Sequence, residues 1–344
     1  MESPAVYFKD LFSGKLLSKN KKAANVQYQQ HPFAVMVRKE IADHIRSWRF
    51  IVLLSLIVLT FLGAMYVSLS NLKAAVANES DPDRLFMYLK LLTATDGSLP
   101  PFHIFMSFLG ALLGISLGFD AVNAEQNNGT LVRLLAQPVY RDNLLLAKFV
   151  SALALVAALF ISLSLLMIGG GLMITGVYIE GVEFLRILAF DILTVLYVGF
   201  WLGLSILLSV RFKQATTSAL TAIGIWLFFT VFYRIIVNMV ATSLLPDPNE
   251  MLPEDILSYN NFILNLLRLA PSQLYTDATT TLLMPSVRSL GPLTMEQLAG
   301  AIPSPLSFRE SLLIVWPQVS GLLAATAVCF ALAYYWFMKR EVRM

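Results

Sequence analysis

The chain has 344 residues, of which 57% are hydrophobic and only 14% are charged, and its formal net charge is +3. Soluble domains carry about 25% charged residues, so this composition excludes an ordinary soluble domain and indicates a membrane protein. The single cysteine, Cys329, excludes a disulfide framework.

The first 49 residues divide into two predicted parts. Residues 1–32 are polar and rich in Lys, Asn and Gln, which predicts a cytoplasmic tail attracted to an anionic membrane surface. In residues 33–49, apolar side chains recur at helical spacing opposite charged ones. The apolar positions are Val37, Ile41, Ile45 and Trp48, and the charged ones are Arg38, Lys39, Asp43 and Arg46. An ordinary amphipathic helix packed on another domain would show the same pattern. Because an apolar run follows directly, we expect an interfacial helix on the inner membrane surface.

Six apolar runs follow, each of 21 residues or more, and about 20 residues suffice to cross a bilayer core. The predicted spans are 50–70, 102–122, 145–172, 185–210, 216–240 and 311–337. With the N-terminus inside, the inner segments, together with Lys148 just inside the third span, hold seventeen of the twenty-five Lys and Arg residues. The outer segments hold seven, and Arg234 lies within the fifth span. This bias predicts that both termini are cytoplasmic.

The last outer segment, residues 241–310, holds eight of the fifteen prolines and is too long for a simple loop. Two pieces of it, 255–270 and 276–284, have helical patterns but are too short to span. We therefore expect short helices that lie on the outer leaflet or re-enter it. The fold class is an all-α integral membrane protein with six transmembrane helices, an N-terminal interfacial helix and short re-entrant or outer helices between helices five and six.

Glycines recur every four residues in the second span, at Gly110, Gly114 and Gly118. Such a small-residue face predicts close contact with another helix.

The same stretch, GISLG, also matches the Gly-x-Ser-x-Gly pattern of a serine nucleophile, Ser116. A serine nucleophile needs a base, and none of the histidines, His31, His44 and His103, is placed deep in another span. Helix packing is therefore the favoured interpretation of the glycines, and an intramembrane protease is disfavoured.

Charged residues within the spans raise two further possibilities. Asp120 and Asp191 could form a carboxylate pair of the aspartyl-protease kind, but the predicted topology places them at opposite ends of the membrane. Arg234 and Asp191 are each seven residues from the outer end of their spans, which places both at about 9 Å depth. A charge there is costly unless it is paired, hydrated or extended to the headgroups. We therefore consider an Asp191–Arg234 pair, with snorkelling of Arg234 as the alternative.

The sequence contains no phosphate-binding Gly-x-x-x-x-Gly-Lys-Ser/Thr loop and no metal-ligand cluster of Cys and His. No soluble segment is large enough for an ATPase domain. We therefore expect a chain that is not itself an enzyme, with no metal and no cofactor of its own.

The inner segment 123–144 is the most patterned part of the chain. Asn127, Asn128 and Gly129 predict a turn, Thr130 can cap a following helix, and Pro138 would end that helix. The apolar face of this short helix consists of Leu131, Leu134 and Leu135, with Val132 at its edge, while Arg133 and Gln137 lie elsewhere. A short helix below the membrane could be pushed by a soluble partner, or could simply rest in the headgroups.

The spacing Glu-x-x-x-Gly-Thr-Leu-x-x-Leu-Leu-x-x-Pro-Val-x-Arg, followed by Leu-Leu-x-x-Lys, resembles the signature of ABC-2-type transporter permeases. The matching positions are Glu125, Gly129, Thr130, Leu131, Leu134, Leu135, Pro138, Val139, Arg141, Leu144, Leu145 and Lys148. The likeness covers about residues 33–340. It departs from the usual pattern at Tyr140, where Ser or Thr is common, and at Ala147, where Gly is common.

The resemblance implies that residues 50–344 form a six-helix ABC-2 transmembrane domain of an exporter in a prokaryotic plasma (inner) membrane. Two permeases, identical or related, would pair in the membrane lipid, and each would dock one separate ABC ATPase subunit, which binds ATP and Mg; no nucleic acid is involved. The coupling residues that it implies are Glu125, Gly129, Thr130, Leu131, Arg133, Leu134, Leu135, Pro138 and Arg141.

The cargo would be a lipid, a peptide or a hydrophobic compound, because the spans carry few charges. Two other classes stay open at this point. A secondary transporter would need ion-coupling carboxylates at the midplane and usually an inverted repeat, and neither is found. A non-transporting membrane anchor or sensor would use residues 241–310 as its binding module.

Overall fold

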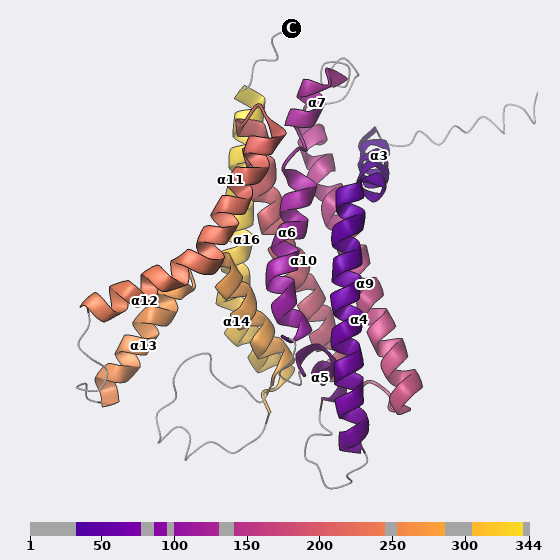
Figure 1. The fold of residues 1–344 in the computed structure, drawn as a ribbon, viewed down its shortest axis with the longest axis vertical. Helices are drawn as coiled ribbons and strands as arrows, with labels where there is room; N and C mark the ends of the chain where they lie inside the picture. Colours follow the sequence, from indigo (N-terminus) through magenta and orange to yellow (C-terminus); the bar gives the residue numbers. More distant parts are fainter. Residues whose placement is uncertain are drawn as a thin grey trace, which may run out of the picture.

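The computed structural model describes residues 32–76, 86–94, 100–130, 141–244, 253–285 and 305–339. Every secondary-structure element in these ranges is a helix, and six stretches are long and apolar enough to cross a membrane (Figure 1). They are Trp48–Ser70, Phe102–Asn127, Asp142–Thr175, Gly181–Arg211, Ala215–Ser243 and Phe308–Lys339. The prediction of an all-helical membrane protein with six spans is confirmed.

Helix α10 (Gly181–Arg211) is the centre of the bundle. It packs against α6 (Phe102–Gly118), α9 (Arg141–Thr175) and α16 (Phe308–Lys339). In its most apolar window 72% of the residues are buried, against 11% for the fifth span. Most side chains in this window of α10 therefore meet other helices, whereas those of the fifth span are left for lipid or for another protein.

The first two described helices are α3 (Pro32–Arg46) and α4 (Trp48–Val76), and the one residue between them, Ser47, is not helical. Figure 1 shows α3 nearly end-on beside the upright α4, so the chain turns sharply at this point. The predicted helix 33–49 thus ends at Arg46, and the placement of α3 on a membrane surface stays a prediction. We call the end of the bundle that carries α3 the α3 end, and the opposite end, with α5 (Met87–Thr93), the α5 end.

The segment between the fifth and sixth spans contains α13 (Pro253–Leu267) and α14 (Pro271–Leu283), close to the two predicted helices. Helix α14 begins five residues before its predicted start, with Pro271 at a position where proline suits a helix N-terminus. It packs against α5, α6, α10 and α16, and Tyr275 and Ala278 are fully buried. Helix α14 is therefore part of the bundle, while its entry into a membrane stays a prediction.

The fifth span is not straight. It consists of α11 (Ala215–Leu227), a π-helical turn (Phe228–Phe232) and α12 (Tyr233–Leu244). The wider turn interrupts the regular hydrogen-bond ladder, and such turns bend helices. After it α12 leaves the bundle beside α13, and the Tyr233 hydroxyl donates to the Leu266 carbonyl at 2.7 Å (Figure 1). The predicted single span 216–240 is therefore two helical halves that point in different directions.

Candidate functional site

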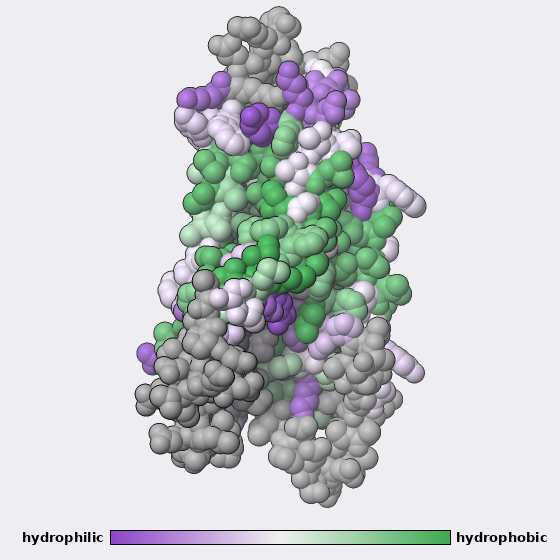
Figure 2. Space-filling view, turned by 60° about the vertical axis from the view of Figure 1, so that its left-hand side comes forward, coloured by the Kyte–Doolittle hydropathy of each residue, from purple (hydrophilic) through white to green (hydrophobic). Residues whose placement is uncertain are grey.

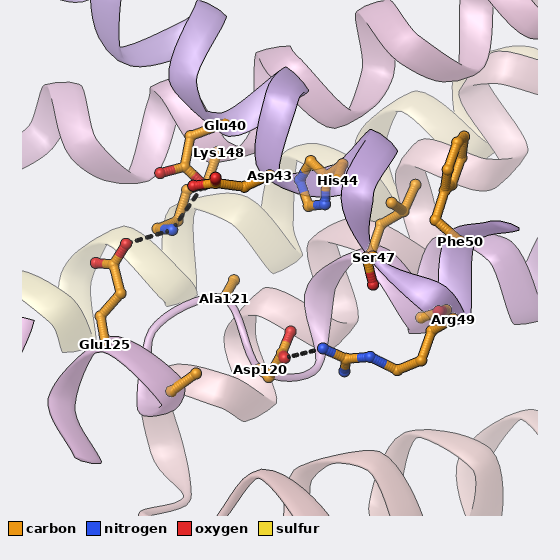
Figure 3. Close-up of a pocket in the computed structure, with 13 residues that line it drawn as sticks. Glu40, Asp43, His44, Ser47, Arg49, Phe50, Asp120, Ala121, Glu125 and Lys148 are labelled. Carbon is orange, nitrogen blue, oxygen red and sulfur yellow. Dashed lines mark hydrogen bonds and ion pairs between the residues drawn. The ribbon is translucent and has the colours of Figure 1, made fainter. Parts of the chain in front are cut away.

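A buried cluster of charges joins three segments at the α3 end. The Lys148 ammonium of α9 lies 2.9 Å from the Glu40 carboxylate of α3 and 2.8 Å from the Glu125 carboxylate of α7 (Asn123–Asn127). Figure 3 shows the three side chains converging. The exposed fractions of these side chains are only 8%, 7% and 13%. The lysine is thus shared by two carboxylates that come from different helices.

The local sequence explains how each segment reaches this point. Glu40 is the one buried residue of α3. Helix α7 is held against α10, because the Ser209 hydroxyl accepts from the backbone amides of Val122 and Asn123 at 3.0 and 3.3 Å. Lys148 lies in the third turn of α9 and is 6% exposed. A short helix with little packing of its own is therefore fixed in place by α10 and by the shared lysine.

The cluster holds more negative than positive charge at its centre, and Lys39 supplies part of the balance. The Lys39 ammonium lies 3.2 Å from Glu40 and 4.0 Å from Glu125. Burial raises the pKa of the Glu40 carboxyl, but Lys148 and Lys39 outweigh burial and hold this pKa below its ordinary value of 4.5. The Glu125 Oε2 atom is buried and has no hydrogen-bond partner among the described residues. The two carboxylates are therefore held by close ion pairs, but one buried oxygen of Glu125 lacks a hydrogen-bond donor among the described residues.

A second ion pair lies close to the cluster. The Arg49 guanidinium of α4 lies 2.6 Å from the Asp120 carboxylate, which follows α6, and 4.7 Å above the ring of Phe119. A small cavity of about 170 Å³ separates this pair from the Glu40–Lys148–Glu125 cluster, as Figure 3 shows. Together the two sets of charges connect α3, α4, the end of α6, α7 and α9.

The same cavity is lined by both Ser116 and His44, a proximity that the sequence did not reveal. The structure shows no hydrogen bond between these two residues. Burial lowers the pKa of His44 below its ordinary value of 6.5. No group of three or more His, Cys, Asp and Glu side chains that could hold a metal ion occurs in the described ranges. The arrangement has the character of an ionic joint between helices.

Gly129 and Thr130 follow α7, the first in the predicted turn and the second at the predicted start of the coupling helix. Gly129 has a φ of +68°, a backbone angle that residues other than glycine rarely adopt. The Thr130 hydroxyl donates a hydrogen bond to the Glu125 carbonyl at 3.1 Å. Of Arg141 the structure describes only the backbone, as the first residue of α9. The remaining predicted coupling residues lie outside the described residues: Leu131, Arg133, Leu134, Leu135 and Pro138.

The glycine face of α6 lies against α10. A Cβ atom on Gly114 would be 2.6 Å from the Val198 carbonyl oxygen, and one on Gly118 would be 2.9 Å from the Leu202 carbonyl oxygen. At Gly110 the nearest atom, in the Val198 side chain, would be 3.4 Å away. The α6 and α10 backbones are therefore closest at the two glycines nearest the α3 end.

Gly114→Ala is expected to destabilise the folded chain by about 1–3 kcal/mol, because the new methyl group would meet backbone that cannot move aside easily. Gly63→Ala in α4 is the matched control, since a Cβ there would have no neighbour within 4 Å. Unfolding midpoints of the two variants in the same detergent check this expectation. Equal stability of the two variants would contradict the close α6–α10 contact.

The structure does not bring Asp191 and Arg234 together, so the predicted pair is corrected. Asp191 is 5% exposed and accepts a hydrogen bond from the Ser164 hydroxyl of α9 at 2.9 Å. Arg234 is exposed on α12, beyond the π-helical turn, and forms no ion pair with Asp191. Equal depth was a necessary condition for pairing, but the bend of the fifth span carries Arg234 away from α10.

Sequence reasoning missed Glu40 altogether and treated Lys148 only as a matching position. A signal was present, because Glu40 falls three residues after Val37 and so lies beside the predicted apolar face of its helix. A carboxylate at such a position needs a buried cation, and Lys148, in the otherwise apolar start of the predicted third span 145–172, is a suitable partner.

The fold and the joint define a multi-pass helical membrane protein in which a buried ion network connects several helices at the α3 end. The model of the ABC-2 family transporter protein matches residues 34–342, and the chain belongs to this family. A relative from Stutzerimonas stutzeri, a probable ABC transporter permease protein NosY, is 28% identical over 290 residues, which cover 84% of this chain and 95% of the relative. A protein of the same name from Pseudomonas aeruginosa is 27% identical over 202 residues, covering 58% and 66% of the two chains. Membership as a permease implies a partner ATPase subunit.

Proposed function

We propose that the chain is the membrane subunit of an ATP-driven exporter and that the α3 end faces the cytoplasm, where a separate ATPase subunit docks on segment 123–144. The observation that carries the proposal is the ionic joint formed by Glu40, Lys148 and Glu125. It fixes α7, which directly precedes the predicted coupling helix, to both α3 and α9. A force applied to that segment would therefore reach two further helices directly.

The excess of basic residues in the segments at the α3 end supports the proposed orientation. The permease would act as a homodimer or heterodimer with two ATPase copies in a prokaryotic plasma (inner) membrane, and ATP and Mg would be bound by the ATPase. The apolar surface of the fifth span, with Leu220 65% and Phe232 51% exposed, supports a second permease as a membrane neighbour. A lipid, a peptide or a hydrophobic compound is the proposed cargo, because buried and exposed faces of the spans are mostly apolar.

The double substitution Leu134→Asp with Arg141→Glu is expected to weaken binding of the ATPase subunit at least tenfold. It places a charge on the apolar face of the coupling helix and reverses a charge at its end. The measurement is co-purification of the ATPase with the permease, together with export in membrane vesicles. Export as in the wild type would overturn the proposed function.

The matched control is Gln137→Glu, which adds a charge to the same segment away from the predicted apolar face. This variant should keep ATPase binding within about twofold, and the amount of permease in the membrane should be the same for all variants. Equal losses in the control and in the double variant would show a general effect of charge rather than a docking face.

A further inference from the structure

A basic hollow of about 700 Å³ lies at the α3 end, separate from the ionic joint. It is formed by the last turn of α10, the short connection to α11 and the last turns of α16. Its lining consists of Val210, Arg211, Phe212, Lys213, Trp336 and Lys339. This volume falls within the range of sites that hold small molecules.

Three of the six lining residues are cations, and none is acidic. Arg211, Lys213 and Lys339 are all exposed, and in the part of the chain that the structure describes none of them forms an ion pair. Two of them rest on aromatic rings instead. The Arg211 guanidinium lies 6.0 Å from the centre of the Trp336 ring, and the Lys339 ammonium lies 4.6 Å from that of Tyr335. Among the described residues no carboxylate is paired with these three cations, and the resulting positive charge makes the hollow attractive to an anion.

The hollow lies where hydrophobic surface gives way to polar surface. On the face that carries α11 and α16, hydrophilic residues gather at the α3 end above a broad hydrophobic band (Figure 2). Val328 and Leu332 of α16, 57% and 42% exposed, lie one to two turns before Trp336. Trp and Tyr are the residues that occupy the headgroup level of membrane proteins. A ligand with an anionic head and apolar chains would match the hollow and the helix surface below it.

We propose that this hollow binds the headgroup of an anionic phospholipid, with the phosphate between Arg211, Lys213 and Lys339 and the acyl chains along α16. Basic pockets between transmembrane helices are suited to such headgroups. An acidic surface of a soluble protein is less well matched, because the apolar side chains of α16 continue directly from the hollow. The proposal rests on the proposed function only for the leaflet, which would be the cytoplasmic one.

The position of the hollow gives lipid binding a structural consequence. The Asn127 side-chain amide of α7 donates to the Lys213 carbonyl at 3.3 Å. The loop that lines the hollow is therefore in contact with α7, which also carries Glu125 of the ionic joint. A bound headgroup would steady this loop and, through Asn127, the start of the coupling segment.

The test is the retention of defined lipids by the full-length permease in detergent, measured by native mass spectrometry with phosphatidylglycerol and phosphatidylcholine. The wild type is expected to bind phosphatidylglycerol in preference. Arg211→Gln with Lys213→Gln should weaken that binding about 25-fold, at about fivefold for each cation removed near a headgroup. Lys339→Gln alone should weaken it about fivefold.

The matched control is Arg234→Gln with Arg309→Gln, which removes two exposed cations away from the hollow. This control should bind phosphatidylglycerol within about twofold of the wild type. Equal binding by the hollow variant and the wild type, or an equal loss in the control, would overturn the proposal. Displacement of the lipid by inorganic phosphate at the same concentration would also overturn it, because the site would then take the free anion.

The hollow variant should still bind the ATPase subunit. If it keeps phosphatidylglycerol but loses the ATPase, the hollow is a protein-docking surface and the lipid proposal fails. Because lipid retention is measured on the permease alone, a failure of the proposed ATPase coupling would leave that result unchanged. The two proposals can therefore fail independently.

Discussion

Replacement of Lys148 by Met is expected to destabilise the folded permease by about 3–5 kcal/mol. The substitution leaves the Glu40 and Glu125 carboxylates buried without their shared cation, and removal of one partner from a buried ion network is strongly unfavourable. The remaining cation nearby, Lys39, lies 3.2 Å from Glu40 but 4.0 Å from Glu125, and it is half-exposed, so it compensates only part of the negative charge. The midpoint of unfolding in detergent and the yield of folded protein are the measurements.

Two further variants separate lost charge balance from lost packing. Lys148→Met combined with Glu40→Gln and Glu125→Gln removes all three charges and should recover most of the stability, since neutral amides at these positions carry no uncompensated charge. Lys39→Gln should lower the free energy of unfolding by less than about 1 kcal/mol, because the Lys39 side chain is 50% exposed. If the triple variant is no more stable than Lys148→Met, charge balance is not what the joint provides.

Replacement of Arg186 by Met is the second change with a large expected effect. Arg186 is fully buried near the α5 end, and in the described ranges it has no carboxylate partner. Its guanidinium donates to the Leu282 carbonyl at 2.9 Å, to the Leu306 carbonyl at 2.6 Å and to the Ser311 hydroxyl at 3.1 Å. These contacts fasten the end of α14 and the start of α16 to α10. Loss of these hydrogen bonds should lower the free energy of unfolding by about 2–4 kcal/mol, because the carbonyl groups that accept from Arg186 would have no donor.

A local readout distinguishes this fastening from a general loss of stability. Leu283 at the end of α14 is 1% exposed, so a cysteine placed there, in a Cys329→Ser background, should resist a hydrophilic maleimide. We expect rapid labelling after Arg186→Met and slow labelling after Arg309→Met, which changes an exposed arginine near the start of α16. Slow labelling in both would show that Arg186 does not hold α14 in place.

The number of spans could be predicted from the sequence because the bilayer core sets a minimum length of apolar helix. That information is local, as the run of apolar residues alone carries it. The approximate positions of α13 and α14 could also be anticipated from helical patterns, although α14 begins five residues before its predicted start. The burial of α14 could not, because it depends on the surface that α10, α6 and α16 leave open.

The charged residues show where sequence reasoning stops. Counting residues along a helix gave the depth of Asp191 and Arg234 but not the direction in which either side chain points. The orientation of α10 about its own axis points Asp191 at Ser164 of α9. The π-helical turn bends the fifth span, so that Arg234 lies outside the bundle. Glu40 and Lys148 are 108 positions apart in the sequence, so only tertiary packing brings them together.

The long separation of Glu40 and Lys148 has a consequence for the order in which the protein is made. Helix α3 leaves the ribosome well before the third span, so when it emerges the Glu40 carboxylate has only the half-exposed Lys39 of its own helix as a counter-charge. Burial of that carboxylate without the Lys148 ammonium is unfavourable, so we expect α3 to stay in water or at the headgroups until α9 is inserted. We therefore expect α3 to dock on the bundle only after the third span, which supplies Lys148, is in place.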